Sequence, residues 1–310
     1  MTKFTALFLL SFSTLSFAGI DVIYGKDERK EFYETTPALK KLAKATAGLV
    51  DIGSLKMSYD SDKFTIPGLT TLGDFMKLCP SEKFFKQPVV TICSGFLISE
   101  DILVTAGHCL IGKKDSPESI CSNSAWIFDF ALTSKSTNPT KNFSMDNTYS
   151  CAEVIEAKLD KTNDYAVIRL AKRVTGREPL KYRQSGKVSA TANLVAIGHP
   201  NGLPLKVSEG GKIIDNSGST RFVASLDTFQ GSSGGAVIDA DTGMLEGIVI
   251  QGKRDYALSD LTNLRSCQTV NVCDDKGLNC TNPDSSEVPG EMVTRITSLS
   301  KAIEKAFATH

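Results

Sequence analysis

Residues 93–109 read Cys-Ser-Gly-Phe-Leu-Ile-Ser-Glu-Asp-Ile-Leu-Val-Thr-Ala-Gly-His-Cys. They contain two short apolar runs, at 95–98 and 102–104, with the turn residues Ser, Glu and Asp between them. Short runs that include β-branched residues and are bordered by turn residues are typical of strands. We therefore predict two strands here, the second of which leads into a histidine, His108, followed directly by a cysteine.

The same pattern of short apolar runs and turn residues continues from residue 88 almost to the end of the chain. Many short strands without alternating helices predict paired antiparallel barrels rather than a parallel sheet. We expect the polar segment 178–187 to connect the two barrels. The strand-like runs are 89–92, 95–98, 102–104, 125–130, 166–170, 194–197, 248–250 and 293–296.

Two segments have the pattern of amphipathic helices. Residues 36–44 begin with a threonine that can cap a helix and a proline that suits its first turn, and their apolar side chains share one face. Residues 298–307 also carry apolar side chains on one face, so we predict a C-terminal helix that packs on the second barrel.

Residues 227–237 read Asp-Thr-Phe-Gln-Gly-Ser-Ser-Gly-Gly-Ala-Val. A serine hydroxyl becomes a good nucleophile when a base takes its proton and backbone N–H groups hold the oxyanion that forms. Glycines on both sides of Ser233 allow the backbone to approach a ligand closely. Because turns rich in Gly and Ser usually only connect strands, this segment indicates catalysis only in combination with others.

Residues 162–170 read Thr-Asn-Asp-Tyr-Ala-Val-Ile-Arg-Leu and supply an acidic residue at the entry of a strand. This residue is Asp164, whereas we expect the nearby Asp160 to be an exposed loop charge. With His108 and Ser233, the chain order is His, Asp, Ser. A further histidine, His199, lies in a turn after a strand, where a structural role is favoured over a place in the cleft.

These three segments resemble the chymotrypsin/trypsin family of serine proteases, which has its catalytic triad in this chain order. The resemblance covers residues 88–305 and implies two antiparallel six-stranded β-barrels and a serine endopeptidase that acts through an acyl-enzyme. By position, Ser233 is the nucleophile, His108 the general base and then acid, and Asp164 the residue that holds the imidazole tautomer. The N–H groups of Gly231 and Ser233 form the oxyanion hole.

Two positions depart from trypsin. Ser232 stands where trypsin has the aspartate that receives the newly cut N-terminus, so we expect that activation switch to be missing. Ile250 replaces a serine that donates to the triad aspartate, so Asp164 is expected to find donors around Gly107 and His108. Both departures are shared with the bacterial trypsin-like and glutamyl-endopeptidase branch, which the chain resembles more closely.

The specificity pocket is predicted from the same resemblance. Asp227 lies six residues before Ser233, where trypsin carries its pocket aspartate, and Glu291 lies on a segment that resembles the far wall. Such carboxylates predict a preference for Lys or Arg at the cleaved position. The alternative is that Asp227 pins its loop by accepting backbone hydrogen bonds. Gln251 and Gly252 are expected to pair with the substrate backbone as an added strand.

The N-terminus has the pattern of a signal peptide, with Lys3 before an apolar run at 4–17 and small residues near 18. This run is too short to span a membrane, so we expect cleavage of residues 1–18 and a secreted or periplasmic protein. Residues 19–87 are predicted as an N-terminal extension or pro-segment. The peptidase domain is predicted at 88–310, with barrel one at about 88–180 and barrel two at about 188–297.

The eight cysteines of an exported chain predict disulfides. The family resemblance implies a Cys93–Cys109 bond, and Cys121 and Cys151 bracket a polar segment and are expected to pair. A zinc site is disfavoured because the spacing of the last cysteines is wrong for it and the chain has only three histidines. Cys79 is the expected outside partner for one of Cys267, Cys273 and Cys280.

The composition limits the partners. Basic and acidic residues balance at 35 each, which argues against nucleic acid and anionic membranes as partners. We expect a protein or peptide substrate, no metal or cofactor, and a monomer. The alternatives are a catalytically silent protease-like binding module and a disulfide-stapled surface or adhesion protein. Esterase activity is a third, which does not exclude proteolysis.

Overall fold

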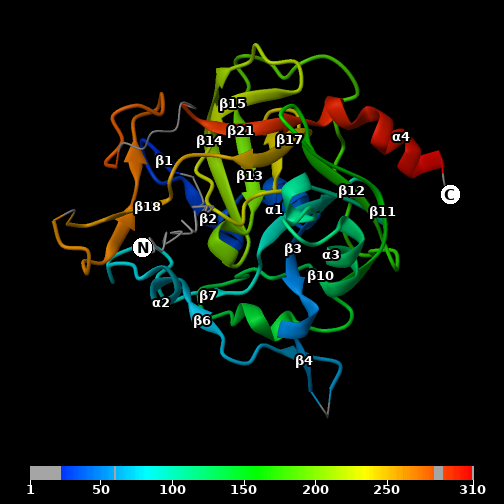
Figure 1. The fold of residues 1–310 in the computed structure, drawn as a ribbon, viewed down its shortest axis with the longest axis horizontal. Helices are drawn as coiled ribbons and strands as arrows, with labels where there is room; N and C mark the ends of the chain where they lie inside the picture. The colour runs from blue at the N-terminus through cyan, green and yellow to red at the C-terminus, as the bar shows by residue number, and fades with distance from the viewer. Residues whose placement is uncertain (1–21, 59–60, 261, 283–288, 309–310) are drawn as a thin grey trace, which may run out of the picture.

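The computed structural model describes residues 22–58, 61–260, 262–282 and 289–308. The predicted signal peptide, residues 1–18, lies outside these residues. Two antiparallel β-barrels lie next to each other, with the C-terminal helix α4 (Ser300–Ala308) at one edge of the molecule (Figure 1). Strands β1 (Ile23–Tyr24) and β18 (Tyr256–Leu258) lie at the opposite edge. None of the helices in the described part of the chain has the length and hydrophobicity that a membrane span requires.

The first barrel closes through antiparallel strands in the order β10-β11-β12-β9-β8-β3. Its strands are β3 (Thr46–Asp51), β8 (Cys93–Leu97), β9 (Ile102–Thr105), β10 (Ser124–Ile127), β11 (Thr148–Leu159) and β12 (Asp164–Leu170).

The second barrel has the strand order β13-β16-β17-β21-β15-β14, and a pairing of β14 with β13 closes it. Strand β2 (Arg29–Glu31) pairs with β14 outside the ring. The predicted fold class of two antiparallel six-stranded barrels with a C-terminal helix is therefore confirmed. The strands are β13 (Leu194–Gly198), β14 (Lys206–Asp215), β15 (Arg221–Ser225), β16 (Ala236–Asp239), β17 (Met244–Gln251) and β21 (Glu291–Arg295).

Shorter elements surround the barrels. The helices are α1 (Pro37–Ala43), α2 (Leu72–Met76) and α3 (Pro117–Asn123). The 3₁₀ turns are Phe32–Glu34, Ile52–Ser54, Gly107–Cys109, Pro139–Asn142, Pro200–Gly202 and Ile296–Leu299. The remaining strands are β4 (Lys56–Met57), β5 (Phe64–Thr65), β6 (Thr70–Thr71), β7 (Pro88–Val89), β19 (Gln268–Val270) and β20 (Val272–Cys273).

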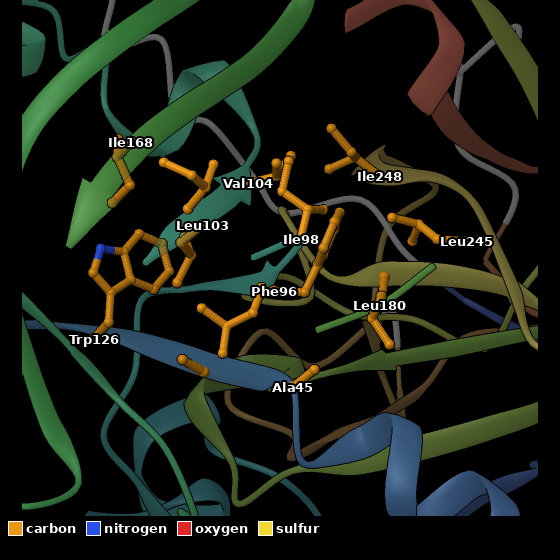
Figure 2. Packing of buried hydrophobic residues seen from close by; sticks show 14 of the residues in the cluster. Ala45, Phe96, Ile98, Leu103, Val104, Trp126, Ile168, Leu180, Leu245 and Ile248 are labelled. Atoms are coloured by element: carbon orange, nitrogen blue, oxygen red, sulfur yellow. The ribbon is translucent and has the colours of Figure 1, made fainter. Parts of the chain in front are cut away.

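A large cluster of buried apolar side chains extends from the first barrel into the second (Figure 2). Trp126 and Phe96 lie fully buried in the first barrel, and Leu245 and Ile248 belong to the second. Leu180, on the connection between the barrels, packs in the same cluster. Burying one large apolar side chain stabilises a fold by roughly 1.5–3 kcal/mol, so this shared core holds the barrels against each other.

The first barrel starts earlier than predicted. Its strand β3 lies within the predicted extension 19–87, so the predicted start at residue 88 is wrong for this barrel. β3 includes Gly48, where a Cβ would lie 2.2 Å from the Thr91 side chain, and this need for small residues weakens the strand pattern. The apolar run 89–92 contributes only β7, which pairs with β6 outside the barrel.

Both predicted helices are confirmed. Thr36 caps α1 by accepting from the N–H of Leu39, and Leu39 and Ala43 are buried. Helix α4 follows a 3₁₀ turn and buries Ala302, Ile303 and Ala306.

Four disulfides connect the eight cysteines. The expected bonds Cys93–Cys109 and Cys121–Cys151 are present, and Cys79 bonds one of its three candidate partners. Cys93–Cys109 joins β8 to the 3₁₀ turn after β9, and Cys121–Cys151 joins α3 to β11. Cys79 bonds Cys267 across 188 residues, and Cys273 bonds Cys280 across 7 residues.

His199 has a structural role, as expected. Its ring is buried, stacks on Phe130 at a centroid distance of 5.7 Å, and donates from Nδ1 to the carbonyl oxygen of Leu203 at 3.0 Å. Nε2 has no partner among the described residues. Burial lowers the pKa of His199 to about 4 despite the opposing effect of the Leu203 carbonyl, so the ring is neutral in the folded protein at neutral pH.

We predict that the loss of stability on removing a disulfide follows the length of the loop it closes. In the chain-entropy description, Cys79→Ala with Cys267→Ala lowers the free energy of unfolding by ~5 kcal/mol, and Cys273→Ala with Cys280→Ala by ~2 kcal/mol. Denaturant unfolding of both double variants measures these losses. Equal losses would contradict the entropic explanation.

We also predict that His199 makes the protein sensitive to acid. Because the folded-state pKa lies below the ordinary value of 6.5, stability falls as pH drops from about 6.5 to about 4, by about 3 kcal/mol in total. Urea unfolding at pH 7 and pH 4 should show a smaller difference for His199→Phe than for the wild type. An identical difference in the two proteins would show that His199 is not the cause.

Candidate active site

His108 and Asp164 form a hydrogen-bonded pair at the edge of the first barrel. His108 lies in the 3₁₀ turn after β9, and Asp164 is the first residue of β12. His108 Nδ1 lies 2.9 Å from Asp164 Oδ2, and the backbone N–H of His108 donates to Oδ1 at 3.0 Å. A donor around His108 was predicted for Asp164 and is confirmed.

This pairing determines the chemistry of the ring. An Nδ1 that faces a carboxylate carries the proton, so Nε2 is left as a proton acceptor. The Asp164 side chain is 10% exposed and the His108 side chain 33% exposed, so the carboxylate is shielded while the ring is accessible. Gly107 permits the arrangement, since a Cβ there would lie 2.0 Å from the Lys158 carbonyl oxygen.

Ser233 belongs to the second barrel and docks on the first. The backbone N–H of Ser94, in β8, donates to the Ser233 carbonyl oxygen at 2.8 Å. Cys109 Sγ lies 3.6 Å from the same oxygen, and Cys109 follows His108 in the chain. Ser233 is partly exposed. The loop of the predicted nucleophile therefore lies against the turn that carries the predicted base.

Gly234 allows this close docking. It has φ +85°, and a Cβ would lie 2.0 Å from the Ser94 carbonyl oxygen. Its N–H donates to the carbonyl oxygen of Val249 in β17 at 2.8 Å. Both the positive φ and the close approach to the Ser94 carbonyl therefore exclude a residue larger than glycine at position 234.

The predicted oxyanion hole has two free donors. Within the described part of the chain, the N–H groups of Gly231 and Ser233 donate to no protein acceptor. Gly231 has φ +91°, and its carbonyl oxygen accepts from Ser94 Oγ at 2.8 Å. The preceding carbonyl, of Gln230, accepts from the N–H of Asn201. Two unpaired N–H groups on either side of a tight turn are what the stabilisation of an oxyanion requires.

The two predicted pocket carboxylates are engaged by the protein itself. Asp227 is 6% exposed, and its Oδ1 and Oδ2 accept from the N–H groups of Tyr24 and Glu28, each at 2.8 Å. Burial raises the pKa of Asp227 to about 7, against the opposing effect of these two N–H groups. Glu291 is fully buried and accepts from Tyr24 Oη at 2.9 Å and from Thr228 Oγ1 at 2.8 Å.

The pocket role of Asp227 and Glu291 stays a prediction, and these contacts give both carboxylates partners within the protein. The alternative, that Asp227 pins its loop through backbone N–H groups, agrees with the contacts, although the donors come from a distant segment rather than a local one. Sequence reasoning missed Tyr24 and Glu28 because a backbone N–H leaves no trace in the residue type.

The remaining site residues behave as follows. Gln251 is exposed at the end of β17 and Gly252 is buried, and their pairing with substrate stays a prediction. Asp160 is exposed, as expected, and accepts from Thr162 and Asn163 in its own loop, which lowers its pKa.

In the part of the chain that the structure describes, one cluster has the composition of a metal site. The potential ligand atoms of Cys93, His108 and Cys109 lie within 4.8 Å of one another. Because the two sulfur atoms are bonded to each other, neither is a thiolate that could bind a metal ion.

The trypsin-like peptidase domain family matches residues 93–248, about half of the chain. No curated protein matches the chain at a significant level. The chain is similar to a solved Glu endopeptidase, with 14% identity, a TM-score of 0.49, and coverage of 93% of this chain and 100% of the other.

It is also similar to the Rv3671c protease of M. tuberculosis. The active form has 12% identity, a TM-score of 0.45 and coverage of 98% of this chain and 93% of the other. The inactive form has 13% identity, a TM-score of 0.45 and coverage of 87% and 92%. At these values the structural similarity carries no argument about the site. The family match, which includes β8 with Cys93 and the segment of Ser233, is sufficient: the chain belongs to the family of trypsin-like peptidases.

Proposed function

We propose that the protein is an exported serine endopeptidase that cleaves peptide bonds through an acyl-enzyme. The observation that carries this proposal is the His108–Asp164 pair at the boundary where the Ser233 loop docks. The match to the trypsin-like peptidase family supports a protease, and the contacts of these residues support a serine mechanism.

In this mechanism His108 Nε2 takes the proton of Ser233 Oγ as that oxygen attacks the scissile carbonyl carbon. Asp164 stabilises the imidazolium that forms, and the N–H groups of Gly231 and Ser233 bind the oxyanion. His108 then gives the proton to the leaving amine. A water molecule, activated by the same imidazole, hydrolyses the acyl-enzyme and regenerates Ser233.

The proposal does not include a Lys/Arg preference set by Asp227. Both oxygens of this carboxylate accept hydrogen bonds from the protein, and burial disfavours its charged form. Pairing of the substrate backbone with Gln251 and Gly252 remains part of the proposal, because Gln251 is exposed at the end of its strand.

Export is proposed from two features. The N-terminal signal pattern predicts secretion or transfer to a periplasm. Four disulfides suit an oxidising compartment, because thiols are kept reduced in the cytosol.

We predict that Ser233→Ala lowers kcat on casein by about 10⁶-fold and Asp164→Asn by about 10⁴-fold, because the triad acts as a unit. Steady-state hydrolysis of casein measures both changes. A Ser233→Ala protein that cleaves casein at the wild-type rate would overturn the assignment.

A fluorophosphonate probe separates the protease from a catalytically silent binding module, because only an activated serine reacts with it. We expect labelling of the wild type at Ser233, identified by peptide mass, and none of His108→Ala. An unlabelled wild type that is folded and binds peptides would support the binding module instead.

A further inference from the structure

We propose that residues 22–31, here called the N-terminal clamp, position the oxyanion hole, and that Asp227 is the positioning residue through which the clamp acts. The inference rests on the proposed function and adds a part of the machinery far from the triad in sequence. It also implies that the working enzyme retains residues 22–31, although they lie within the predicted extension or pro-segment.

The first connection between clamp and loop is the Asp227 carboxylate. It is buried, and its two oxygens accept from the N–H groups of Tyr24 and Glu28. A buried carboxylate without donors is strongly unfavourable, so the clamp and the beginning of the 227–233 loop stabilise each other.

The next two residues of the loop are also attached to the clamp. Glu291 accepts from Tyr24 Oη with one oxygen and from Thr228 Oγ1 with the other, and so joins the two. The Arg29 guanidinium lies 4.0 Å from the centroid of the buried Phe229 ring. Bonds from Arg29 Nε and Nη2 to Asp27, at 3.0 and 2.8 Å, hold the guanidinium in place.

Gln230 connects the loop residues that the clamp holds to the first N–H of the oxyanion hole, that of Gly231. Its N–H donates to Asp255 Oδ2 at 3.2 Å, and its carbonyl oxygen accepts from the N–H of Asn201. In a trans peptide the carbonyl and the following N–H point in opposite directions. The contact with Asn201 therefore directs the free N–H of Gly231 away from Asn201, and a rotation of this peptide would remove one oxyanion donor.

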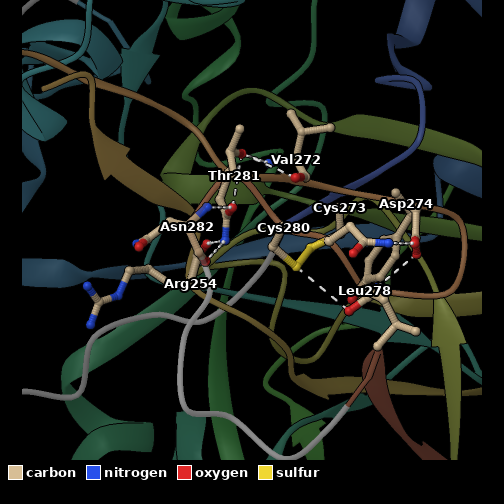
Figure 3. Close-up of a disulfide and its surroundings, with 12 residues drawn as sticks. Arg254, Val272, Cys273, Asp274, Leu278, Cys280, Thr281 and Asn282 are labelled. Carbon is tan, nitrogen blue, oxygen red and sulfur yellow. Dashed lines mark hydrogen bonds between the residues drawn. A yellow bond between two sulfur atoms is a disulfide. The ribbon is translucent and has the colours of Figure 1, made fainter. Parts of the chain in front are cut away.

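The clamp is itself anchored at both ends. β1 pairs in parallel with β20, through N–H groups of Ile23 and Gly25 that donate to Asn271 and Cys273 at 3.0 and 2.9 Å. Figure 3 shows the loop that follows β20, closed by the Cys273–Cys280 disulfide. At the other end of the clamp, β2 pairs with β14 of the second barrel.

Asp255 connects the segment that pairs with β1 to the 227–233 loop. The N–H of Asn271 donates to the Asp255 carbonyl oxygen at 2.8 Å. The Asp255 carboxylate in turn accepts the hydrogen bond from the N–H of Gln230. The clamp thus reaches Gln230 by two routes, through the loop residues 227–229 and through Asn271 and Asp255.

Asp227→Asn tests the proposal. The amide keeps the shape of the side chain but can accept from only one of the two clamp N–H groups, and its NH₂ group faces the other. A matched control is Asp239→Asn. Asp239, at the far end of β16, is equally buried and accepts a backbone N–H from Asp241 at 3.0 Å.

Four quantities are measured on the full chain: the rate of labelling by a fluorophosphonate, the kcat for casein, the KM for casein, and the cleavage profile on a peptide library. For Asp227→Asn we expect labelling rate and kcat to fall by about 10–100-fold, since a shift of about 1 Å in a catalytic group has effects of this size. KM and the cleavage profile should stay close to those of the wild type. Asp239→Asn should match the wild type in all four.

Two results would overturn the proposal. An unchanged labelling rate together with an unchanged cleavage profile in folded Asp227→Asn would mean that the clamp only stabilises the fold. A changed cleavage profile at an unchanged labelling rate would assign Asp227 to the specificity pocket instead. If the wild type is not labelled at all, the proposed function fails first, so the two failures are distinguishable.

Tyr24→Phe provides a second variant if Asp227→Asn does not fold. It removes only the hydroxyl that donates to Glu291 and keeps the backbone N–H that binds Asp227. We expect a smaller fall in labelling rate, of about 3–10-fold, with an unchanged KM. A wild-type labelling rate in folded Tyr24→Phe would contradict the route through Glu291 and Thr228.

Discussion

Ser94, a fully buried residue of β8, makes the contacts on which the candidate site depends. Its N–H donates to the Ser233 carbonyl and its Oγ donates to the Gly231 carbonyl, each at 2.8 Å, so it holds both ends of the turn that carries the oxyanion donors. Its neighbour Cys93 is bonded to Cys109, which follows His108. The predicted nucleophile and the predicted base are therefore both placed relative to the same two consecutive residues of the first barrel.

The sequence predicted those parts of the structure that local pattern determines. The strand pair around residues 95–104, helices α1 and α4, and the partner of Asp164 all follow from residues close to one another in the chain or from a specific motif. Strand β3 was missed because it is held by neighbours on β8 and β10, whose packing requires small residues such as Gly48. β11 was missed because its mostly partly buried and exposed side chains and two register shifts hide the alternation.

Asp227 shows the limit of reasoning from position. Its place before Ser233 suggests a pocket carboxylate, yet its hydrogen-bond donors lie 203 and 199 residues away in the chain. These donors are backbone N–H groups, which every residue except proline provides, so residue type cannot reveal them. Only the tertiary structure shows that this carboxylate faces the N-terminal clamp. The clamp binds Asp227 through backbone N–H groups of Tyr24 and Glu28, which lie within the chain. Holding the 227–233 loop in this way does not require the charged amine of a newly cut N-terminus.

The central claim is that Ser233, His108 and the N–H groups of Gly231 and Ser233 meet around one reacting atom. A crystal structure of the protein treated with a fluorophosphonate tests this most directly. The account predicts phosphorus bonded to Ser233 Oγ, one phosphoryl oxygen at about 2.7–3.1 Å from both N–H nitrogens, and His108 Nε2 beside the adduct. An adduct on another residue, or on Ser233 with its phosphoryl oxygen turned toward solvent, would contradict it.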